Sequence, residues 1–133
     1  DWGRAVPVDT TLDAVDAAAY DALVLPGGVI NPDKLRVEPK AIEIIRSFVG
    51  DGRIVAAICH GPWLLAEADA ADGRQMTSYA SIRTDMENAG AHWIDKEVVT
   101  DEGIITSRSP EDLPAFVTKI VEEIGEARHQ RAA

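Results

Sequence analysis

Cysteine, basic residues and long apolar runs are all scarce in this sequence. A single cysteine among 133 residues excludes an intramolecular disulfide. No apolar run approaches bilayer-spanning length and no charged-then-apolar leader opens the chain, so we expect a cytoplasmic protein that does not act at a membrane. The 13 Lys and Arg residues are outnumbered by 23 Asp and Glu residues, giving a net charge of −10 that disfavours binding to nucleic acid phosphates.

Nucleotide-binding and metal-binding signatures are also missing. Gly27 and Gly28 follow an apolar run, yet neither Gly-x-Gly-x-x-Gly nor Gly-Lys-Ser/Thr occurs, which disfavours a nucleotide loop. His92 and His129 have no second ligand at metal-binding spacing. We therefore predict neither a cofactor nor a metal site.

The residues that are present suit one domain with a sizeable core. Hydrophobic residues make up 46% of the sequence and charged residues 27%, without an internal repeat or a linker. We expect a single domain over residues 1–133, with a frayed tail over residues 128–133.

Apolar runs with β-branched residues alternate with apolar positions at helical spacing. This order predicts an α/β domain with a mainly parallel sheet, in which ligands bind beyond the carboxyl ends of the strands. We expect a loop at residues 31–33, and a hairpin between residues 98–100 and 104–106. A short strand should begin at residue 20 and be broken by the turn at residues 26–28. The other expected strands are 54–58, 75–78 and 93–94, and the expected helices begin near residues 39, 62, 82 and 110. The last helix should bury Phe116, Val117, Ile120, Val121 and Ile124.

The only cysteine lies where an apolar strand meets a helix. Cys59 follows the run Ile54–Ile58 directly, and Gly61 and Pro62 open the next helix. A side chain in such a strand-turn-helix elbow projects from the carboxyl end of the sheet, as a nucleophile must. Free cysteines are more often inert and buried, but the turn and the adjacent His60 favour a functional role.

Other chemistry-bearing residues have simpler interpretations. Arg108 either forms an ion pair near the site or lies on the surface. The aromatic residues are expected in the core, because each belongs to an apolar periodic segment; they are Trp63, Tyr79, Trp93 and Phe116.

Five motifs occur in order, and together they carry a resemblance. They are Leu25–Gly28, Ala57–Pro62, Thr77–Tyr79, Asp85–Trp93 and Ile105–Leu113. In these segments the chain resembles the PfpI family of intracellular cysteine-dependent hydrolases. That family includes peptidase-like proteins, the Parkinsonism-associated deglycase, glutathione-independent glyoxalases and general stress proteins. The resemblance implies a flavodoxin-like three-layer sandwich, related to class I glutamine amidotransferases.

The resemblance also implies roles for particular residues. Cys59 would be the nucleophile and His60 its partner, with the backbone N–H groups of Gly28 and His60 as oxyanion donors. Asp33 would be the third member, supplied across a subunit contact of a homo-oligomer. Relatives also carry a first strand and helix, with a glutamate that contacts the cysteine, before the position at which this sequence begins. The resemblance therefore implies one of three cases: the chain is a fragment, this portion comes from a companion segment, or the upstream sequence is not included here.

Two classes of function remain open. The first is a cysteine-dependent hydrolase, deglycase or glyoxalase acting on peptides, glycated amino groups or small aldehydes. The second is a non-catalytic redox sensor or chaperone-like stress protein with an oxidisable cysteine. A glutamine amidotransferase is disfavoured, because no His-x-Glu pair occurs between Ser78 and Ala133.

Overall fold

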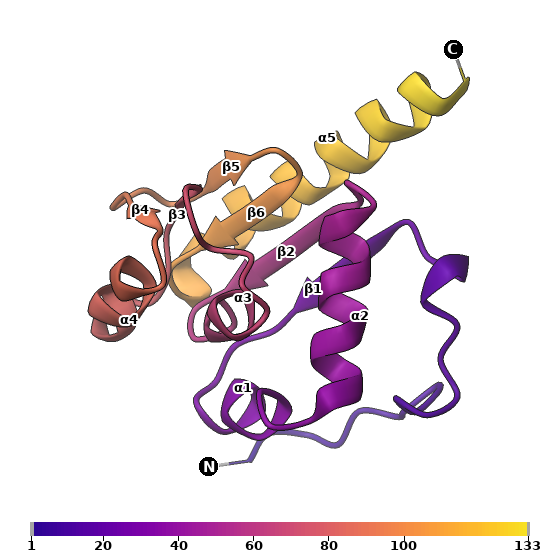
Figure 1. Ribbon diagram of the computed structural model, residues 1–133, viewed down its shortest axis with the longest axis horizontal. Coiled ribbons are helices and arrows are strands. Elements are labelled where there is room, and N and C mark those ends of the chain that lie inside the picture. The colour runs from indigo at the N-terminus through magenta and orange to yellow at the C-terminus, as the bar shows by residue number, and fades with distance from the viewer. Residues whose placement is uncertain (1, 133) are drawn as a thin grey trace.

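A four-stranded sheet crosses the centre of the computed structural model, which describes residues 2–132, with side chains up to residue 127 (Figure 1). Its strand order is β1-β2-β6-β5. The strands are β1 (Ala22–Leu25), β2 (Ile54–Ile58), β5 (Val99–Asp101) and β6 (Ile104–Ser107). β1, β2 and β6 are parallel, while β5 runs antiparallel to β6 and forms the expected hairpin with it.

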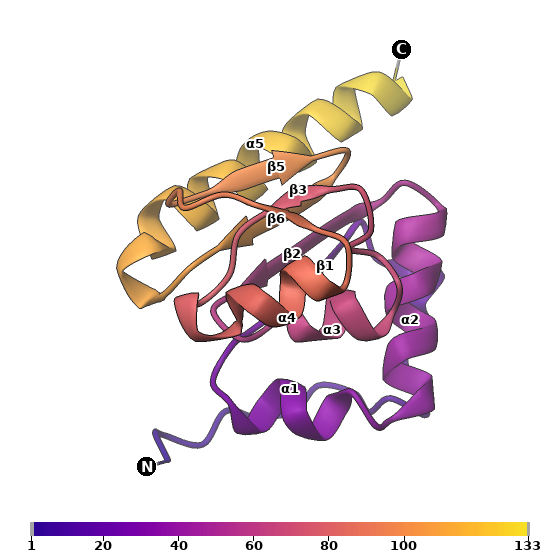
Figure 2. The ribbon, with the colours of Figure 1, turned by 60° about the vertical axis from the view of Figure 1, so that its left-hand side comes forward.

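Helices cover both faces of this sheet, as the views in Figures 1 and 2 show. One face carries α2 (Pro39–Gly50) and α3 (Trp63–Glu67), with α1 (Ile30–Leu35) and α4 (Arg83–Asn88) beyond them. The other face carries α5 (Leu113–Ala132). The result is a helix–sheet–helix sandwich, which confirms the α/β fold class predicted from the sequence.

β2 separates the two halves of the hydrophobic core. Val55 and Ala57 face the α2 and α3 side, whereas Ile54, Ala56 and Ile58 pack towards α5. All five residues of β2 are buried, because a central parallel strand has helices on both sides. Cys59 directly follows the carboxyl end of this buried strand.

Smaller elements complete the chain. β3 (Gln75–Met76) and β4 (His92–Trp93) form a separate parallel pair. Single 3₁₀ turns occur at η1 (Ala17–Ala19), η2 (Ala80–Ile82) and η3 (Pro110–Asp112).

Three details differ from the sequence prediction or extend it. The expected loop at residues 31–33 is part of α1, because Pro32 falls in the first helical turn, where its missing N–H is not needed. Val117 and Val121 are 51% and 65% exposed, since α5 meets the sheet only through the face that carries Phe116 and Ile120. Backbone residues 128–132, expected to be frayed, continue α5; their side chains and residue 133 lie outside the described residues.

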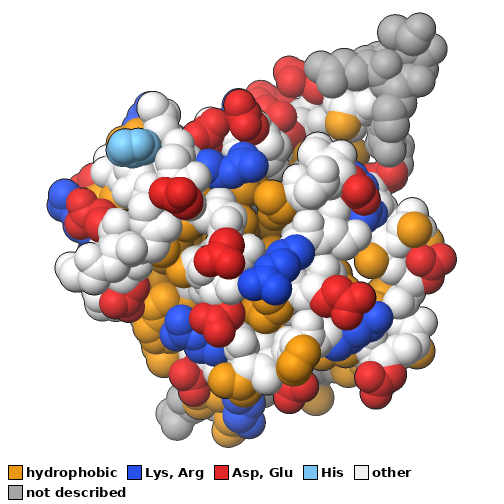
Figure 3. Space-filling view, in the orientation of Figure 1, with side chains coloured by type: hydrophobic (Ala, Val, Ile, Leu, Met, Phe, Trp, Pro, Cys, Tyr) orange, Lys and Arg blue, Asp and Glu red, His pale blue; other side chains and the backbone are white. Residues whose placement is uncertain are grey.

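The surface is of mixed charge on the face in Figure 3, where acidic and basic side chains are interspersed.

Beside β1, the segment 9–17 and α2 enclose an apolar groove of about 490 Å³. Among the described residues, no helix combines the length and the apolar character that crossing a bilayer requires.

Candidate functional site

The backbone of Cys59 adopts a left-handed conformation at the elbow between β2 and α3. Its φ angle is 64°, a value that a non-glycine residue adopts only at an energetic cost. Two hydrogen bonds hold it there. The Cys59 N–H donates to the carbonyl of Ser107 at 3.0 Å, and the Cys59 carbonyl accepts from the N–H of Tyr79 at 2.9 Å. The peptide groups on both sides of the sulfur are therefore tied to β6 and to the 77–82 segment.

Glycines allow the elbow to pack against the end of β1. A Cβ atom placed on Gly27 would lie 2.6 Å from the Cβ of Cys59 and 3.3 Å from its Sγ. A Cβ atom on Gly61 would lie 2.6 Å from the carbonyl oxygen of Leu25. The two distances of 2.6 Å are shorter than van der Waals contact. Only glycine therefore fits at position 27 or 61 without a shift of the backbone. The Pro26-Gly27-Gly28 turn and the Cys59 elbow thus meet as one unit.

His60 links the sulfur to a second side chain. Its Nδ1 lies 3.3 Å from Sγ of Cys59, and its Nε2 lies 3.3 Å from Oγ of Ser81. His60 is buried and Cys59 is partly exposed. The imidazole therefore bridges a nucleophilic thiol and a serine hydroxyl.

Burial lowers the pKa of His60 below its ordinary value of 6.5, because the imidazolium loses hydration. The neutral imidazole is consequently the dominant form near pH 7. A neutral imidazole can accept a proton from the thiol, as a general base does.

Two aromatic rings hold the imidazole plane. The Tyr79 ring stacks on His60 with centroids 4.9 Å apart, and Trp63 meets it edge-on at 5.1 Å. The expectation that all four aromatic residues are core residues is wrong for Tyr79, which is 42% exposed and lies against the site. The sequence gave no indication of this, because the position of Tyr79 depends on how the chain runs after β3 ends at Met76.

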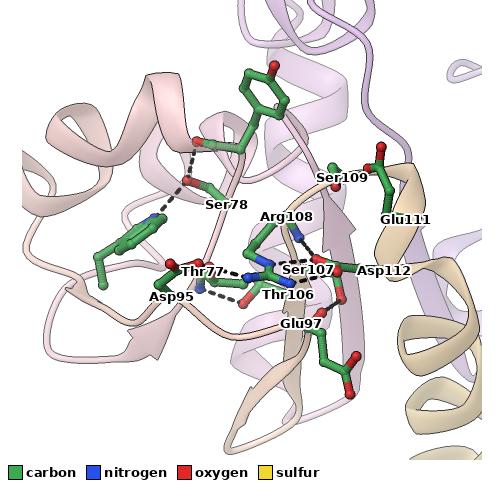
Figure 4. Close-up of polar contacts among 12 residues, drawn as sticks. Thr77, Ser78, Asp95, Glu97, Thr106, Ser107, Arg108, Ser109, Glu111 and Asp112 are labelled. Carbon is green, nitrogen blue, oxygen red and sulfur yellow. Dashed lines mark hydrogen bonds and ion pairs between the residues drawn. The ribbon is translucent and has the colours of Figure 1, made fainter.

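The segment that carries Tyr79 and Ser81 is anchored to the sheet (Figure 4). The Thr77 N–H donates to Oγ1 of Thr106 on β6 at 2.9 Å. Trp93 Nε1 donates to Oγ of Ser78, whose hydroxyl donates in turn to the Tyr79 carbonyl. These bonds fix the segment relative to Cys59.

Arg108, which directly follows β6, is bonded to η3 and to the 93–99 segment (Figure 4). Its backbone N–H, Nε and Nη2 donate three hydrogen bonds of 2.9 Å to the carboxylate of Asp112, and Nη1 donates to Asp95. Asp112 is buried, and the Arg108 guanidinium lowers the pKa of this carboxyl below its ordinary value of 3.8. Of the two interpretations of Arg108, the structure supports the ion pair. The residue before it, Ser107, is the one that accepts the Cys59 N–H.

The remaining site candidates lie at different distances from the sulfur. Gly28 directly follows the glycine that packs on Cys59, and its φ angle is 75°. Among the described residues, the N–H groups of Gly28 and His60 donate to no protein acceptor. Asp33 is exposed in the first turn of α1 and, within the described part of this chain, forms no hydrogen bond or ion pair with Cys59 or His60.

Ser81 is the site residue that the sequence interpretation missed. It lies two positions after the Thr77–Tyr79 motif, so the motif marked the segment but not the hydroxyl. No group of three or more potential metal ligands occurs among the residues described.

Comparisons with known proteins identify the family to which this chain is similar. The model of the "DJ-1/PfpI family" matches residues 2–123. "General stress protein 18" of Bacillus subtilis is 50% identical over 112 residues, which cover 84% of this chain and 64% of that protein. "Deglycase PfpI" of Pyrococcus furiosus is 49% identical over 119 residues, which cover 90% of this chain and 71% of that protein. The chain thus spans less than two thirds of the length of the first of these relatives.

A solved structure shares the fold as well as the sequence pattern. DJ-1beta of Drosophila melanogaster superimposes with a TM-score of 0.83 at 36% identity, over 90% of this chain and 64% of that one. The motifs, the family match and the sandwich all lead to one conclusion: this chain belongs to the DJ-1/PfpI family.

Proposed function

We propose that this chain carries the nucleophile of a cysteine-dependent hydrolase acting on carbonyl compounds, with glycated amino groups and small aldehydes as the substrate class. The observation that carries the proposal is the distance of 3.3 Å between Sγ of Cys59 and Nδ1 of His60, at a partly exposed elbow. A relative named as a deglycase, 49% identical, supports this choice of substrate.

The chemistry follows from the groups around the sulfur. Neutral His60 accepts the thiol proton at Nδ1, and the thiolate attacks the carbonyl carbon. A C–S bond forms while the carbonyl π pair moves to oxygen, which accepts hydrogen bonds from the N–H groups of Gly28 and His60. In a glycated amino group the nitrogen is attached to the hydroxyl-bearing carbon beside the carbonyl; there the C–S bond forms as the C–N bond breaks, and the amine leaves with the proton held by His60. Water then cleaves the C–S bond and restores the thiol. With a small aldehyde, the same attack gives a hemithioacetal on Cys59.

Replacement of the nucleophile tests the proposal. Cys59→Ser should lower turnover of a methylglyoxal-modified amine by about a thousandfold or more, because a serine hydroxyl beside one imidazole is a far weaker nucleophile. His92→Asn is the matched control, since His92 is exposed on β4 away from the elbow. A peptide reporter assayed in parallel distinguishes a peptidase from a deglycase. Unchanged turnover in the Cys59→Ser protein would refute the proposal.

Oxidation is the alternative favoured by the partial exposure of Cys59. A thiol beside a basic nitrogen reacts with peroxide to give a sulfenic acid. If peroxide modifies Cys59 rapidly while no carbonyl substrate is consumed, a redox sensor replaces the enzyme as the function of this site. Intact-protein mass after peroxide treatment measures the modification.

A further inference from the structure

The ring of Tyr79 covers one face of the His60 imidazole. The two rings stack with their centroids 4.9 Å apart and their planes inclined by 27°. His60 is only 8% exposed, whereas the tyrosine that stacks on it is 42% exposed. We propose that Tyr79 is a positioning residue, whose ring shields one face of the imidazole from water and holds Nδ1 against the sulfur of Cys59. This inference rests on the proposed function, in which Nδ1 accepts the thiol proton.

The imidazole needs this support because its other contacts do not fix its orientation. Rotation about the bond between Cβ and the ring of a histidine has broad energy minima. The thiol at Nδ1 is a weak donor, and the Ser81 hydroxyl at Nε2 lies 3.3 Å away, beyond the usual hydrogen-bond range. A rotated ring would carry Nδ1 away from Sγ of Cys59. Stacking opposes that rotation, because it would press the imidazole into the face of Tyr79.

Trp63 restrains the imidazole from another side but shields it less. Its indole is inclined by 70° to the imidazole, with the centroids 5.1 Å apart. The indole Nε1–H donates to Asp85 on α4 at 2.9 Å, and the guanidinium of Arg36 lies 5.3 Å from the indole centroid. Both of these charged groups are thus engaged by the indole. Because a stacked ring covers more of a face than a steeply inclined one, the shielding falls mainly to Tyr79.

Water at this face matters because hydration favours the imidazolium. Burial, rather than a neighbouring charge, lowers the pKa of His60 below 6.5. The other titratable groups against the ring are the Cys59 thiol at Nδ1 and the phenol of Tyr79 itself. Removal of the tyrosine ring would admit water to the imidazole and return its pKa towards the ordinary value.

The backbone of Tyr79, rather than its hydroxyl, places the ring. Its N–H donates to the Cys59 carbonyl at 2.9 Å, and its carbonyl accepts from Oγ of Ser78 at 3.0 Å. Within the described part of the chain, the phenol hydroxyl takes part in no hydrogen bond. The aromatic ring is therefore the part of the side chain that acts on His60, and phenylalanine should replace it without loss.

Three single variants of the full chain test the inference by NMR. A pH titration of the His60 ring signals gives the pKa of the imidazole, and ¹³C relaxation of the same ring reports its mobility. In Tyr79→Ala the pKa should rise towards 6.5, so that the imidazolium fraction at pH 6.5 approaches one half, and the ring should become more mobile. Tyr79→Phe should match the unsubstituted protein in both measurements. Tyr20→Ala is the matched control, because this exposed tyrosine precedes the amino end of β1, whereas the elbow packs beyond its carboxyl end.

Each outcome decides the question. If either the pKa or the ring mobility is unchanged in Tyr79→Ala, the inference is overturned. It is also overturned if Tyr79→Phe or Tyr20→Ala changes His60 as much as Tyr79→Ala does. Neither readout requires catalytic turnover. Failure of the proposed enzyme activity would therefore appear in the Cys59→Ser assay, while the role of Tyr79 would be judged separately by NMR.

Discussion

Gly27 is the residue at which a single added methyl group would reach the side chain of Cys59. An added Cβ would lie 2.6 Å from the Cβ of Cys59 and 2.9 Å from the carbonyl oxygen of Ile58. Gly27→Ala should therefore lower the free energy of unfolding by about 1–3 kcal/mol, as overpacking does, and should change the alkylation rate of Cys59 by displacing the elbow. Urea denaturation and iodoacetamide labelling measure the two effects.

The matched control is a glycine with free space around it. Gly50 ends α2, and a Cβ added there meets nothing within 4 Å. Gly50→Ala should leave alkylation unchanged and raise the free energy of unfolding by up to about 1 kcal/mol, the difference in helix propensity. Equal behaviour of the two variants would contradict the close packing of Gly27 on Cys59.

Single residues also show where sequence reasoning succeeded. Cys59 and His60 are neighbours in sequence, and the glycines of the Pro-Gly-Gly turn lie at the end of the adjacent strand, so local pattern and sheet topology together indicated this corner. Ser81 could not be found in this way. It is an exposed serine in a short turn, and its distance from His60 depends on the hydrogen bond between Tyr79 and Cys59.

At the scale of elements, the Arg108–Asp112 pair joins the end of β6 to η3, the turn directly before α5 (Figure 4). Asp112→Ala should lower the free energy of unfolding by about 2–4 kcal/mol, because it removes three hydrogen bonds from a buried carboxylate. Glu87→Ala, which breaks the exposed Arg83–Glu87 pair, should cost only about 0.3–0.5 kcal/mol. Similar losses in the two variants would contradict a structural role for the buried pair.

The same pair has a defined dependence on pH. Arg108 lowers the pKa of Asp112 in the folded protein below the ordinary value of 3.8. The unfolded chain therefore binds the proton more tightly, and the stabilisation is complete above that pH and declines as pH falls through the lower folded-state pKa. Asp112→Asn should flatten this decline. Unfolding curves between neutral and acid pH provide the measurement.

The elements themselves were predictable to different degrees. β2 is a run of five apolar residues flanked by glycine-containing turns, a pattern that only a strand buried on both faces explains well. α2 begins at Pro39 and ends at Gly50, as its start and stop signals indicated. α1 was missed because Asn31-Pro32-Asp33 is a turn-forming sequence, and its helical conformation depends on packing against α3.

At the scale of the whole molecule, the exposed carboxylate of Asp33 is available to a second copy of the chain. If it completes the site of a neighbouring subunit, Asp33→Ala and Cys59→Ser proteins should be inactive alone and should recover activity when co-expressed. In a statistical mixture of dimers, about a quarter of the sites would contain both groups. Turnover of the co-expressed sample measures the recovery, and sequential affinity purification on two different tags, one on each variant, establishes that mixed oligomers form. A mixed oligomer without activity would exclude a shared site.

The tied peptide groups of Cys59 have a consequence for trapping experiments. Both the N–H and the carbonyl of Cys59 already have hydrogen-bond partners. Attachment of an adduct to the sulfur therefore requires no change in these backbone hydrogen bonds. We expect the backbone of the elbow to keep its conformation when the sulfur is modified. Side chains around it would move to accommodate larger reagents, above all the solvent-exposed ring of Tyr79. The hydrogen-exchange rate of the Cys59 amide should consequently be the same in free and alkylated protein, even if the Tyr79 ring changes its orientation.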